Sequence, residues 1–167
     1  MKEKIEEAYQ YAKKGLYDEA LQICDDFINN HPHERKGYKE KSFIFELMNR
    51  WDNAIETVTK LIDSGSTEPD DFFSRGRWNL MVGNFVGAIK DFTEVIEIEK
   101  KAGSTYYTES AYFGRAESNL RAGYYEEAIK DCEEVREGFT LHLTGRLRTK
   151  ENIIHDATEM RVEKKHR

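Results

Sequence analysis

The sequence predicts an all-α protein, an α-solenoid of four helical hairpins followed by a C-terminal capping helix. One observation is an alanine followed by an aliphatic residue, a pair that recurs at intervals of 34, 34 and 40 residues. The four pairs are Ala20-Leu21, Ala54-Ile55, Ala88-Ile89 and Ala128-Ile129. A period of this length indicates stacked helix-turn-helix units, because no single unit can bury its apolar face alone.

Two further observations place a helix start and a helix end beside each pair. An aromatic residue stands three positions before each alanine, at Tyr17, Trp51, Phe85 and Tyr125. Glycine or asparagine stands five positions before it, at Gly15, Asn49, Gly83 and Gly123. These two residue types adopt the left-handed backbone conformation that ends one helix and lets the next fold back. Each unit is therefore predicted to be a helical hairpin.

Apolar residues at helical spacing predict the eight hairpin helices in order. The first helices are expected at residues 3–14, 35–48, 69–82 and 106–121, and the second helices at 17–29, 51–63, 85–99 and 125–137. Pro69 suits a first helical turn, and Asp70 and Asp71 face the positive end of that helix. We predict a single domain over residues 1–167, with repeats at 1–34, 35–68, 69–102 and 109–137.

The chain changes character after the third and the fourth repeats. Six extra residues fall around 100–108 and are expected to lengthen the adjacent helices. After Gly138, apolar and polar residues alternate and predict a short extended connector, and helical spacing then returns and predicts a closing helix at 145–163. We expect this helix to cap the array, because the last hairpin would otherwise expose an apolar face. A functional arm is the alternative.

The period and the residues together resemble the tetratricopeptide repeat, whose pattern is W-x2-L-G-x2-Y, then A-x3-F, then P. Matching residues cover residues 1–136 and are Ala8, Tyr11, Ala20, Pro32, Tyr38, Ser42, Phe45, Ala54, Phe72, Gly76, Ala88, Phe92, Tyr112, Ala116, Ala128 and Val135. The family leucine is replaced by Glu7, Lys41, Arg75 and Arg115, and the family tyrosine by Asn79 and Asn119 in the last two repeats. We expect the charged side chains to lay their stems along the helix pair, with their heads in water.

Composition excludes several classes of protein. The chain has 38% apolar and 35% charged residues and a formal net charge of -6, which disfavours nucleic acid as a partner. It has no apolar run long enough for a membrane helix and no secretory signal, so we expect a cytoplasmic protein that does not bind membranes. Cys24 and Cys132 lack metal-site spacing and are expected to be buried, reduced thiols.

No catalytic motif is present. The sequence contains no GxGxxG, GxxxxGK[ST], HExxH or GxSxG string. His31-Pro32-His33 offers two imidazoles to a metal but falls in an inter-repeat turn without an evident third ligand. We therefore predict no metal, no cofactor and no enzymatic activity.

The resemblance implies that the first helices line a concave groove that binds a partner. The residues expected to bind it are Ile5, Tyr9, Lys36, Lys39, Phe43, Phe73, Arg77, Leu80, Phe113, Glu117 and Leu120. The competing interpretation is that the aromatic members pack against one another or against the closing helix. Other aromatic residues already fill the family core positions, so we favour an apolar binding surface.

The groove is not expected to hold a C-terminal carboxylate. Co-chaperone members of the family grip such a group with lysines, asparagines and an arginine, but the corresponding residues here are Ile5, Tyr9, Glu40, Asp70 and Ser74. The two acidic residues would repel a carboxylate. An extended or helical peptide, or the edge of a folded partner, is expected instead.

The resemblance implies a protein-protein interaction scaffold or adaptor. We expect it to act as a monomer or weak homodimer. The alternative is a dedicated immunity protein or secretion chaperone that neutralises a cognate bacterial toxin or effector. An enzyme is the third class, and no convergent polar set supports it.

Overall fold

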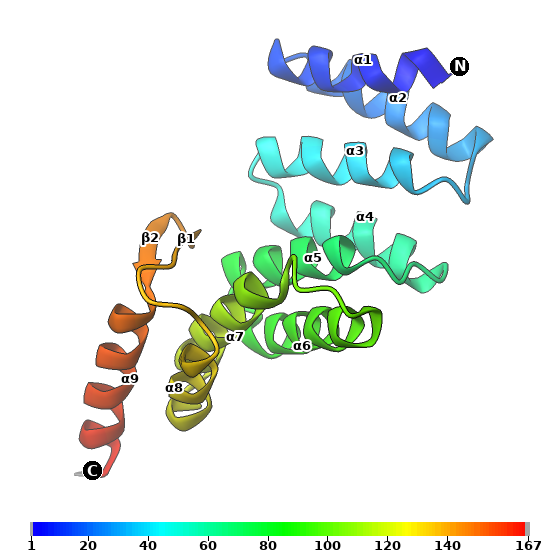
Figure 1. Ribbon diagram of the computed structural model, residues 1–167. Coiled ribbons are helices and arrows are strands. Elements are labelled where there is room, and N and C mark those ends of the chain that lie inside the picture. The colour runs from blue at the N-terminus through cyan, green and yellow to red at the C-terminus, as the bar shows by residue number, and fades with distance from the viewer. Residues whose placement is uncertain (1, 166–167) are drawn as a thin grey trace. The chain divides into compact units, whose positions relative to one another are not determined.

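The computed structural model describes residues 2–165, and the all-α class is confirmed for them. Residue 1 of the first predicted repeat and residues 166–167 of the predicted domain lie outside this range. The helices are α1 (Lys2–Lys13), α2 (Tyr17–Asn30), α3 (Arg35–Leu47), α4 (Trp51–Asp63), α5 (Pro69–Met81), α6 (Phe85–Ala102), α7 (Thr108–Ala122), α8 (Tyr125–Glu133) and α9 (Lys150–Lys165), with strands β1 (Thr140–Leu143) and β2 (Arg146–Thr149) before α9 (Figure 1). None of these helices is long and apolar enough to cross a lipid bilayer.

Contacts divide the chain into two compact units, which meet in sequence between Thr67 and Glu68. The N-terminal unit holds α1 to α4, and the C-terminal unit holds α5 to α9 with the two strands. Each unit packs its helices as consecutive antiparallel hairpins. That these units form a single domain remains a prediction.

The predicted turn residues adopt the predicted conformation. Gly83 has φ 81° and Asn49 has φ 56°, both in the left-handed region that favours glycine and tolerates asparagine. The backbone N–H of Arg50 donates to the Phe45 carbonyl, and that of Asn84 donates to the Asn79 carbonyl, so the turns bind carbonyls at the helix ends. The second helix of each hairpin can then pack back on the first.

The core of the N-terminal unit lies between α1, α2 and α3. Its buried residues are Ile5, Ala8, Ala12, Ala20, Cys24, Phe27 and Ile44. Gly37 lets α3 approach α2 closely, since a Cβ built there would stand 2.8 Å from side-chain carbons of both Phe27 and Ile28. A larger residue at this position would force the two helices apart.

The core of the C-terminal unit is centred on Phe92, which is fully buried. A Cβ built on Gly76 of α5 would stand 3.1 Å from the Phe92 ring, and one built on Gly114 of α7 would stand 2.5 Å from it. The two glycines therefore leave the space that the ring fills between α5 and α7. Small residues at these positions set how closely both first helices approach α6.

Two buried polar triads replace the family leucine and tyrosine in the C-terminal unit. Arg75 donates from Nε and Nη2 to the Asp91 carboxylate at 3.0 and 2.6 Å, and Asn79 Nδ2 donates to the same carboxylate at 2.9 Å. The expectation that the arginine heads reach water is wrong, because the Arg75 side chain is only 15% exposed and its head is held by Asp91. A family packing position is thus filled by a complete hydrogen-bonded set.

The second triad repeats this geometry one hairpin later. Arg115 donates to Asp131 at 2.9 and 2.7 Å, and Asn119 Nδ2 donates to it at 3.0 Å. Arg115 Nη1 also reaches Thr93 Oγ1 on α6 at 3.1 Å, which links the two hairpins. Burial opposes the charge of Arg115, but the hydrogen bond and the charge of Asp131 outweigh it and raise its pKa.

Buried Glu99 organises the six-residue insertion. Its carboxylate accepts hydrogen bonds from the Ser104 hydroxyl, from the backbone N–H groups of Tyr107 and Thr108, and from the Thr108 hydroxyl. These bonds fix the turn that joins α6 to α7 and cap the start of α7. As expected, the insertion lengthens both helices, to 18 and 15 residues.

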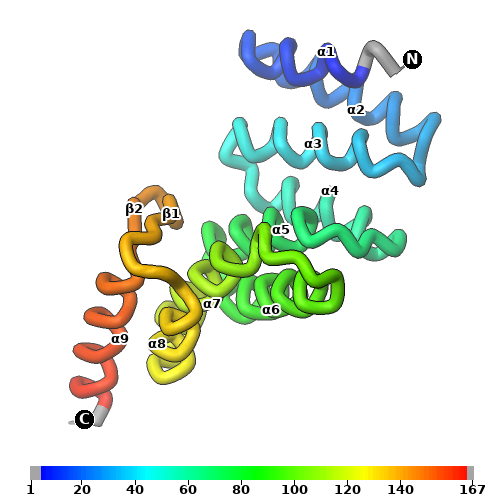
Figure 2. The backbone as a smooth tube through the Cα atoms, viewed as in Figure 1, coloured from blue at the N-terminus to red at the C-terminus, as the bar shows by residue number. Residues whose placement is uncertain are grey.

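The segment after α8 departs from the prediction, as the tube in Figure 2 shows. The extended connector is one strand of an antiparallel hairpin, in which Thr140 pairs with Thr149 and Leu143 with Arg146. Residues 146–149, expected within the closing helix, form the second strand. Thr144 and Gly145, with φ 50° and 76°, supply the two left-handed residues of a type I′ turn. The closing helix therefore begins at Lys150.

Candidate functional site

Two of the predicted binding residues form an aromatic pair on the N-terminal unit. The Tyr9 ring on α1 lies 5.7 Å from the Phe43 ring on α3, and Phe43 is 40% exposed. Consecutive first helices thus bring together side chains 34 positions apart, as the repeat period predicts. Phe43 is an apolar ring that this unit leaves in water.

Lysines lie beside this pair. Lys36 Nζ lies 2.8 Å from the Glu6 carboxylate, and Lys13 Nζ lies 5.4 Å from the centre of the Tyr9 ring. Lys39 stands one turn before Phe43 on the same face of α3. We call Tyr9, Lys36, Lys39 and Phe43 the Tyr9–Phe43 surface. It combines an exposed aromatic side chain with two lysines, and exposed aromatic residues are enriched at protein interfaces.

Glu40 adds a carboxylate beside this surface. The pKa of Glu40 is raised, because partial burial and the charge of Glu6 together outweigh the opposite effect of Lys36. A second carboxylate brought to this position would be repelled, as the comparison with co-chaperones predicts.

In the C-terminal unit, the predicted residue Phe73 lies within a chain of aromatic contacts. Its ring lies 5.6 Å from Phe92 and 5.3 Å from Tyr107, and Tyr107 in turn lies 4.8 Å from Tyr106. The Tyr107 hydroxyl donates to Asp70 at 3.3 Å, and Tyr106 is 82% exposed. Phe73 is therefore half-buried. Arg77, one turn further along α5, is also half-buried.

Tyr106 and Tyr107 were not among the predicted binding residues. Both lie in the insertion, where no repeat position identifies them. The available signal was the presence of two adjacent aromatic residues in an otherwise small and polar segment, which is unusual for a solvent-exposed turn.

Five of the predicted binding residues are buried: Ile5, Leu80, Phe113, Glu117 and Leu120. Ile5 belongs to the N-terminal core, and the three apolar residues of α5 and α7 belong to the C-terminal core. Phe139, just before β1, lies 5.5 Å from the Phe113 ring. The segment after α8 thus covers Phe113 and Glu117 on this face of α7.

Glu117 is fully buried and holds the β-hairpin against α7. Its carboxylate accepts hydrogen bonds from Arg121 Nε at 3.0 Å and from Arg148 Nε on β2 at 3.1 Å. Arg148 Nη2 also donates to Asp156 on α9 at 2.7 Å. This network joins three elements, and Glu117 acts within it as a structural residue.

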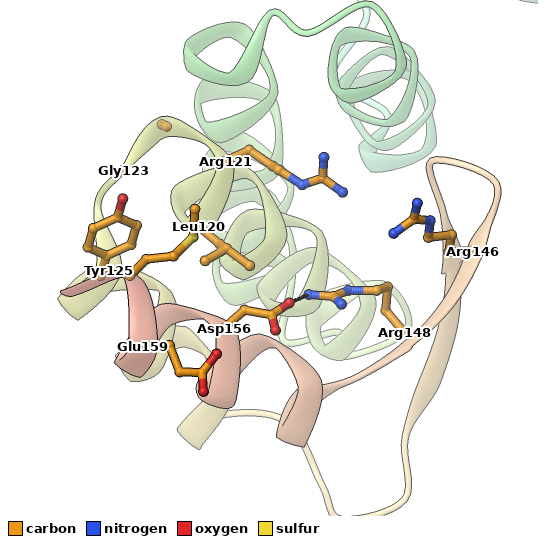
Figure 3. Close-up of a pocket in the computed structure, with 10 residues that line it drawn as sticks. Leu120, Arg121, Gly123, Tyr125, Arg146, Arg148, Asp156 and Glu159 are labelled. Atoms are coloured by element: carbon orange, nitrogen blue, oxygen red, sulfur yellow. Dashed lines mark hydrogen bonds and ion pairs between the residues drawn. The ribbon is translucent and has the colours of Figure 1, made fainter. Parts of the chain in front are cut away.

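A pocket opens beside that network, among the end of α7, the start of α8, β2 and α9 (Figure 3). Its volume is about 520 Å³. Arg121, Arg146 and Arg148 line one side, and Leu120, Tyr125 and Met160 provide apolar surface. No signal in the sequence pointed to this pocket, because its walls come from three separate segments.

The two cysteines are protonated thiols inside the two cores. Cys24 and Cys132 are buried and free, as predicted, and burial raises the pKa of each thiol to about 12. Such thiols are protonated at neutral pH and are poor nucleophiles. No group of three or more histidine, cysteine, aspartate or glutamate side chains among the described residues is arranged to hold a metal ion.

No family model and no curated protein matches the sequence, but many solved structures share its fold. A MamA structure superposes with a TM-score of 0.79 at 18% identity, over 97% of this chain and 85% of that chain. YrrB, a tetratricopeptide-repeat protein with an unusual peptide-binding site, gives 0.72 at 15% identity over 98% and 77%. A tetratricopeptide-repeat protein from Parabacteroides merdae gives 0.70 at 15% identity over 95% and 57%.

Three independent observations now agree. The hairpin helices begin and end within a few residues of the predicted positions, and α8 differs most, ending four residues early at Glu133. The repeat positions Ala20, Ala54, Ala88 and Ala128 are all fully buried between paired helices. Together with the likeness to solved structures, they show that this chain has the tetratricopeptide-repeat fold.

Proposed function

We propose that the protein is a non-catalytic interaction scaffold that binds a segment of a partner protein through the Tyr9–Phe43 surface. The observation that carries the proposal is the aromatic pair itself: the two rings are in contact, and Phe43 is 40% exposed, with Lys36 and Lys39 before it on the same helix. Aromatic residues at such positions supply large contact area at little conformational cost.

Charge supports the same proposal. Lys39 and Lys36 lie one and two turns before Phe43 on α3, where they can bind carbonyl groups of a segment that contacts the ring. Phe73 and Arg77 are the corresponding candidates on the C-terminal unit. YrrB, which shares the fold, has a peptide-binding site, and a peptide is the occupant we propose here.

We further propose a cytoplasmic protein that acts as a monomer or weak homodimer. The adaptor function and the dedicated immunity or chaperone function are distinguished by the identity of the partner protein. If the captured partner is one toxin or effector, the second function is the correct one.

The proposal is tested by capturing the partner with the wild-type protein and then titrating the purified partner calorimetrically. Phe43→Ala is expected to weaken binding by about thirtyfold or more, the effect of losing an aromatic hot spot. Tyr11→Ala is the matched control, since Tyr11 is an aromatic residue of the same unit, is 36% exposed and lies outside the surface. Equal affinity of Phe43→Ala and the wild type would contradict the proposal.

A further inference from the structure

The β-hairpin between α8 and α9 has two edges, and the register of its strands determines which backbone groups point outward. Leu143 and Arg146 flank the two-residue turn and pair with each other, so they form a hydrogen-bonded pair. Hydrogen-bonded and non-hydrogen-bonded pairs alternate along an antiparallel ladder. The next pair, His142 with Leu147, is therefore non-hydrogen-bonded, and its N–H and C=O groups point away from the partner strand.

The pair of Thr140 with Thr149, at the open end of the hairpin, has the same phase. The backbone N–H of Thr149 agrees with this register, because it donates to Asn152 Oδ1 at 3.1 Å and not to Thr140. That bond caps the start of α9 and occupies one end of the β2 edge. The β1 edge has no such cap.

The β1 edge is therefore the open edge of the hairpin. Along it, Thr140 and His142 present two N–H and two C=O groups, spaced two residues apart as in any strand that pairs with a neighbour. Within the part of the chain that the structure describes, these four groups accept and donate no hydrogen bond. Both side chains are exposed. Unpaired backbone groups at a sheet edge are a template for one more strand.

We infer that an extended segment of a partner protein pairs with β1 as an antiparallel third strand. The four backbone groups select this occupant, because an extended chain offers complementary donors and acceptors at the same spacing. A two-stranded sheet is marginal by itself, and a third strand stabilises it. This site goes beyond the proposed function. None of its residues belongs to the Tyr9–Phe43 surface, so each site can be refuted without the other.

Leu141 adds a side-chain preference to the backbone pairing. It lies between Thr140 and His142 but points to the other side of β1, where it packs against the core of the C-terminal unit. The residue of the added strand opposite Leu141 forms a non-hydrogen-bonded pair with it, in which side chains lie closest. An apolar, β-branched residue fits that position. The residues on either side of it must each have an N–H group for the β1 edge.

The probe is an acetylated, amidated pentapeptide, Lys-Thr-Val-Thr-Lys, whose valine is placed opposite Leu141. One twin carries an N-methyl group on the second threonine, whose N–H faces β1, and the other carries it on valine, whose N–H points away. Amide NMR signals of the full-length protein are followed during titration. The parent peptide and the valine twin are expected to give saturable shifts at Thr140 and His142. The threonine twin should bind at least about tenfold more weakly, because it loses a donor to the edge.

Two proline variants complete the test with the parent peptide. His142→Pro removes an N–H from the β1 edge, and Leu147→Pro removes the matching N–H of the same pair from the β2 edge. Neither N–H belongs to the ladder, so both variants should keep the hairpin, and cross-strand nuclear Overhauser signals between Thr140 and Thr149 verify this. His142→Pro should weaken binding by about tenfold or more, and Leu147→Pro should bind like the wild type.

Three results would overturn the inference. The first is that the parent peptide gives no saturable shift at Thr140 and His142. The second is that the two methylated twins bind equally, which the wild-type protein alone decides even if a proline variant loses its hairpin. The third is that the signals of these residues depend on protein concentration without peptide, because the occupant of the edge would then be a second copy of this chain.

Discussion

Replacing Asp91 with alanine should strongly destabilise the C-terminal unit. Asp91 lies far along the chain from the proposed binding residues of the N-terminal unit. Its carboxylate accepts from Arg75 through two nitrogens and from Asn79 through one. Asp91 is 2% exposed and Asn79 5% exposed, so water cannot replace the lost acceptor. The alanine variant removes the buried acceptor that a guanidinium and an amide share.

The expected cost is about 3–5 kcal/mol, the usual penalty for removing one member of a buried ion pair. The free energy of unfolding falls by about 2 kcal/mol per molar urea. A cost of this size therefore lowers the urea concentration at the unfolding midpoint by about 1.5–2.5 M. Replacing both charged residues together, as Arg75→Met with Asp91→Leu, should recover part of that loss, because no buried charge is then left without its counterion, although Asn79 Nδ2 still loses its acceptor.

Tryptophan fluorescence isolates the unit that carries the triad. The chain has two tryptophans, and Trp78 is a buried residue of α5. With Trp51→Phe in every protein, urea unfolding followed by fluorescence reports on Trp78 alone. Glu56→Ala is the control, since Glu56 pairs with Lys60 on the exposed face of α4, and its midpoint should not change measurably. The reasoning is refuted if Asp91→Ala shifts the midpoint no more than this control.

Three further outcomes follow from the same contacts. Phe113→Ala should lower the free energy of unfolding by about 3–5 kcal/mol, because the substitution leaves a cavity in the core. Urea unfolding measures this loss, and an unchanged midpoint would show that the ring lies outside the core. Cys24 and Cys132, with thiol pKa values of about 12, should react with a thiol reagent at pH 8 only after unfolding. Their contribution to the free energy of unfolding should be complete below about pH 8.5 and should fall as the pH rises toward 12. Glu99→Gln should speed amide hydrogen exchange at Tyr107 and Thr108, whose N–H groups donate to this carboxylate, and unchanged exchange would count against its role in the insertion.

Much of the fold could be predicted because the repeat encodes its own register. Asn49 and Gly83 identify turns through a backbone requirement that is local to one residue, and Ala54 and Ala88 identify positions that are buried between paired helices. Such features depend on neighbours within one hairpin. They are therefore readable from spacing alone.

The hairpin after α8 could not be recognised so easily. Its turn is Thr144-Gly145, in which only the second residue is a usual left-handed residue, and its second strand contains Arg146 and Arg148 on the core-facing side. Charged residues at those positions conceal the alternation that marks a strand. The burial of Arg148 is permitted by Glu117 and Asp156, which come from other elements.

The candidate site was predicted only in part for a related reason. Spacing correctly placed Tyr9 and Phe43 side by side, but spacing states only which face of a helix a residue occupies. It cannot state what covers that face. Phe113 and Glu117 occupy the predicted face of α7 and are buried because Phe139 and Arg148, from a later segment, lie on them.

The arginines of the two triads show the same limit. Arg75 was expected to extend into water because a lone charge is not buried. The acceptor that makes burial possible, Asp91, lies 16 positions away on the next helix. Nothing in the local pattern pairs the two residues.

The central claim is that a partner contacts the Tyr9–Phe43 surface, and site-specific photo-crosslinking tests it most directly. A photoreactive benzoylphenylalanine replaces Phe43 in one protein and Tyr11 in another, and each is irradiated with the captured partner. We predict one crosslinked product from position 43, none from position 11, and loss of that product when Lys36 and Lys39 are both replaced by glutamate. Crosslinks from position 11 alone, or from neither position while the partner remains bound, would contradict the claim.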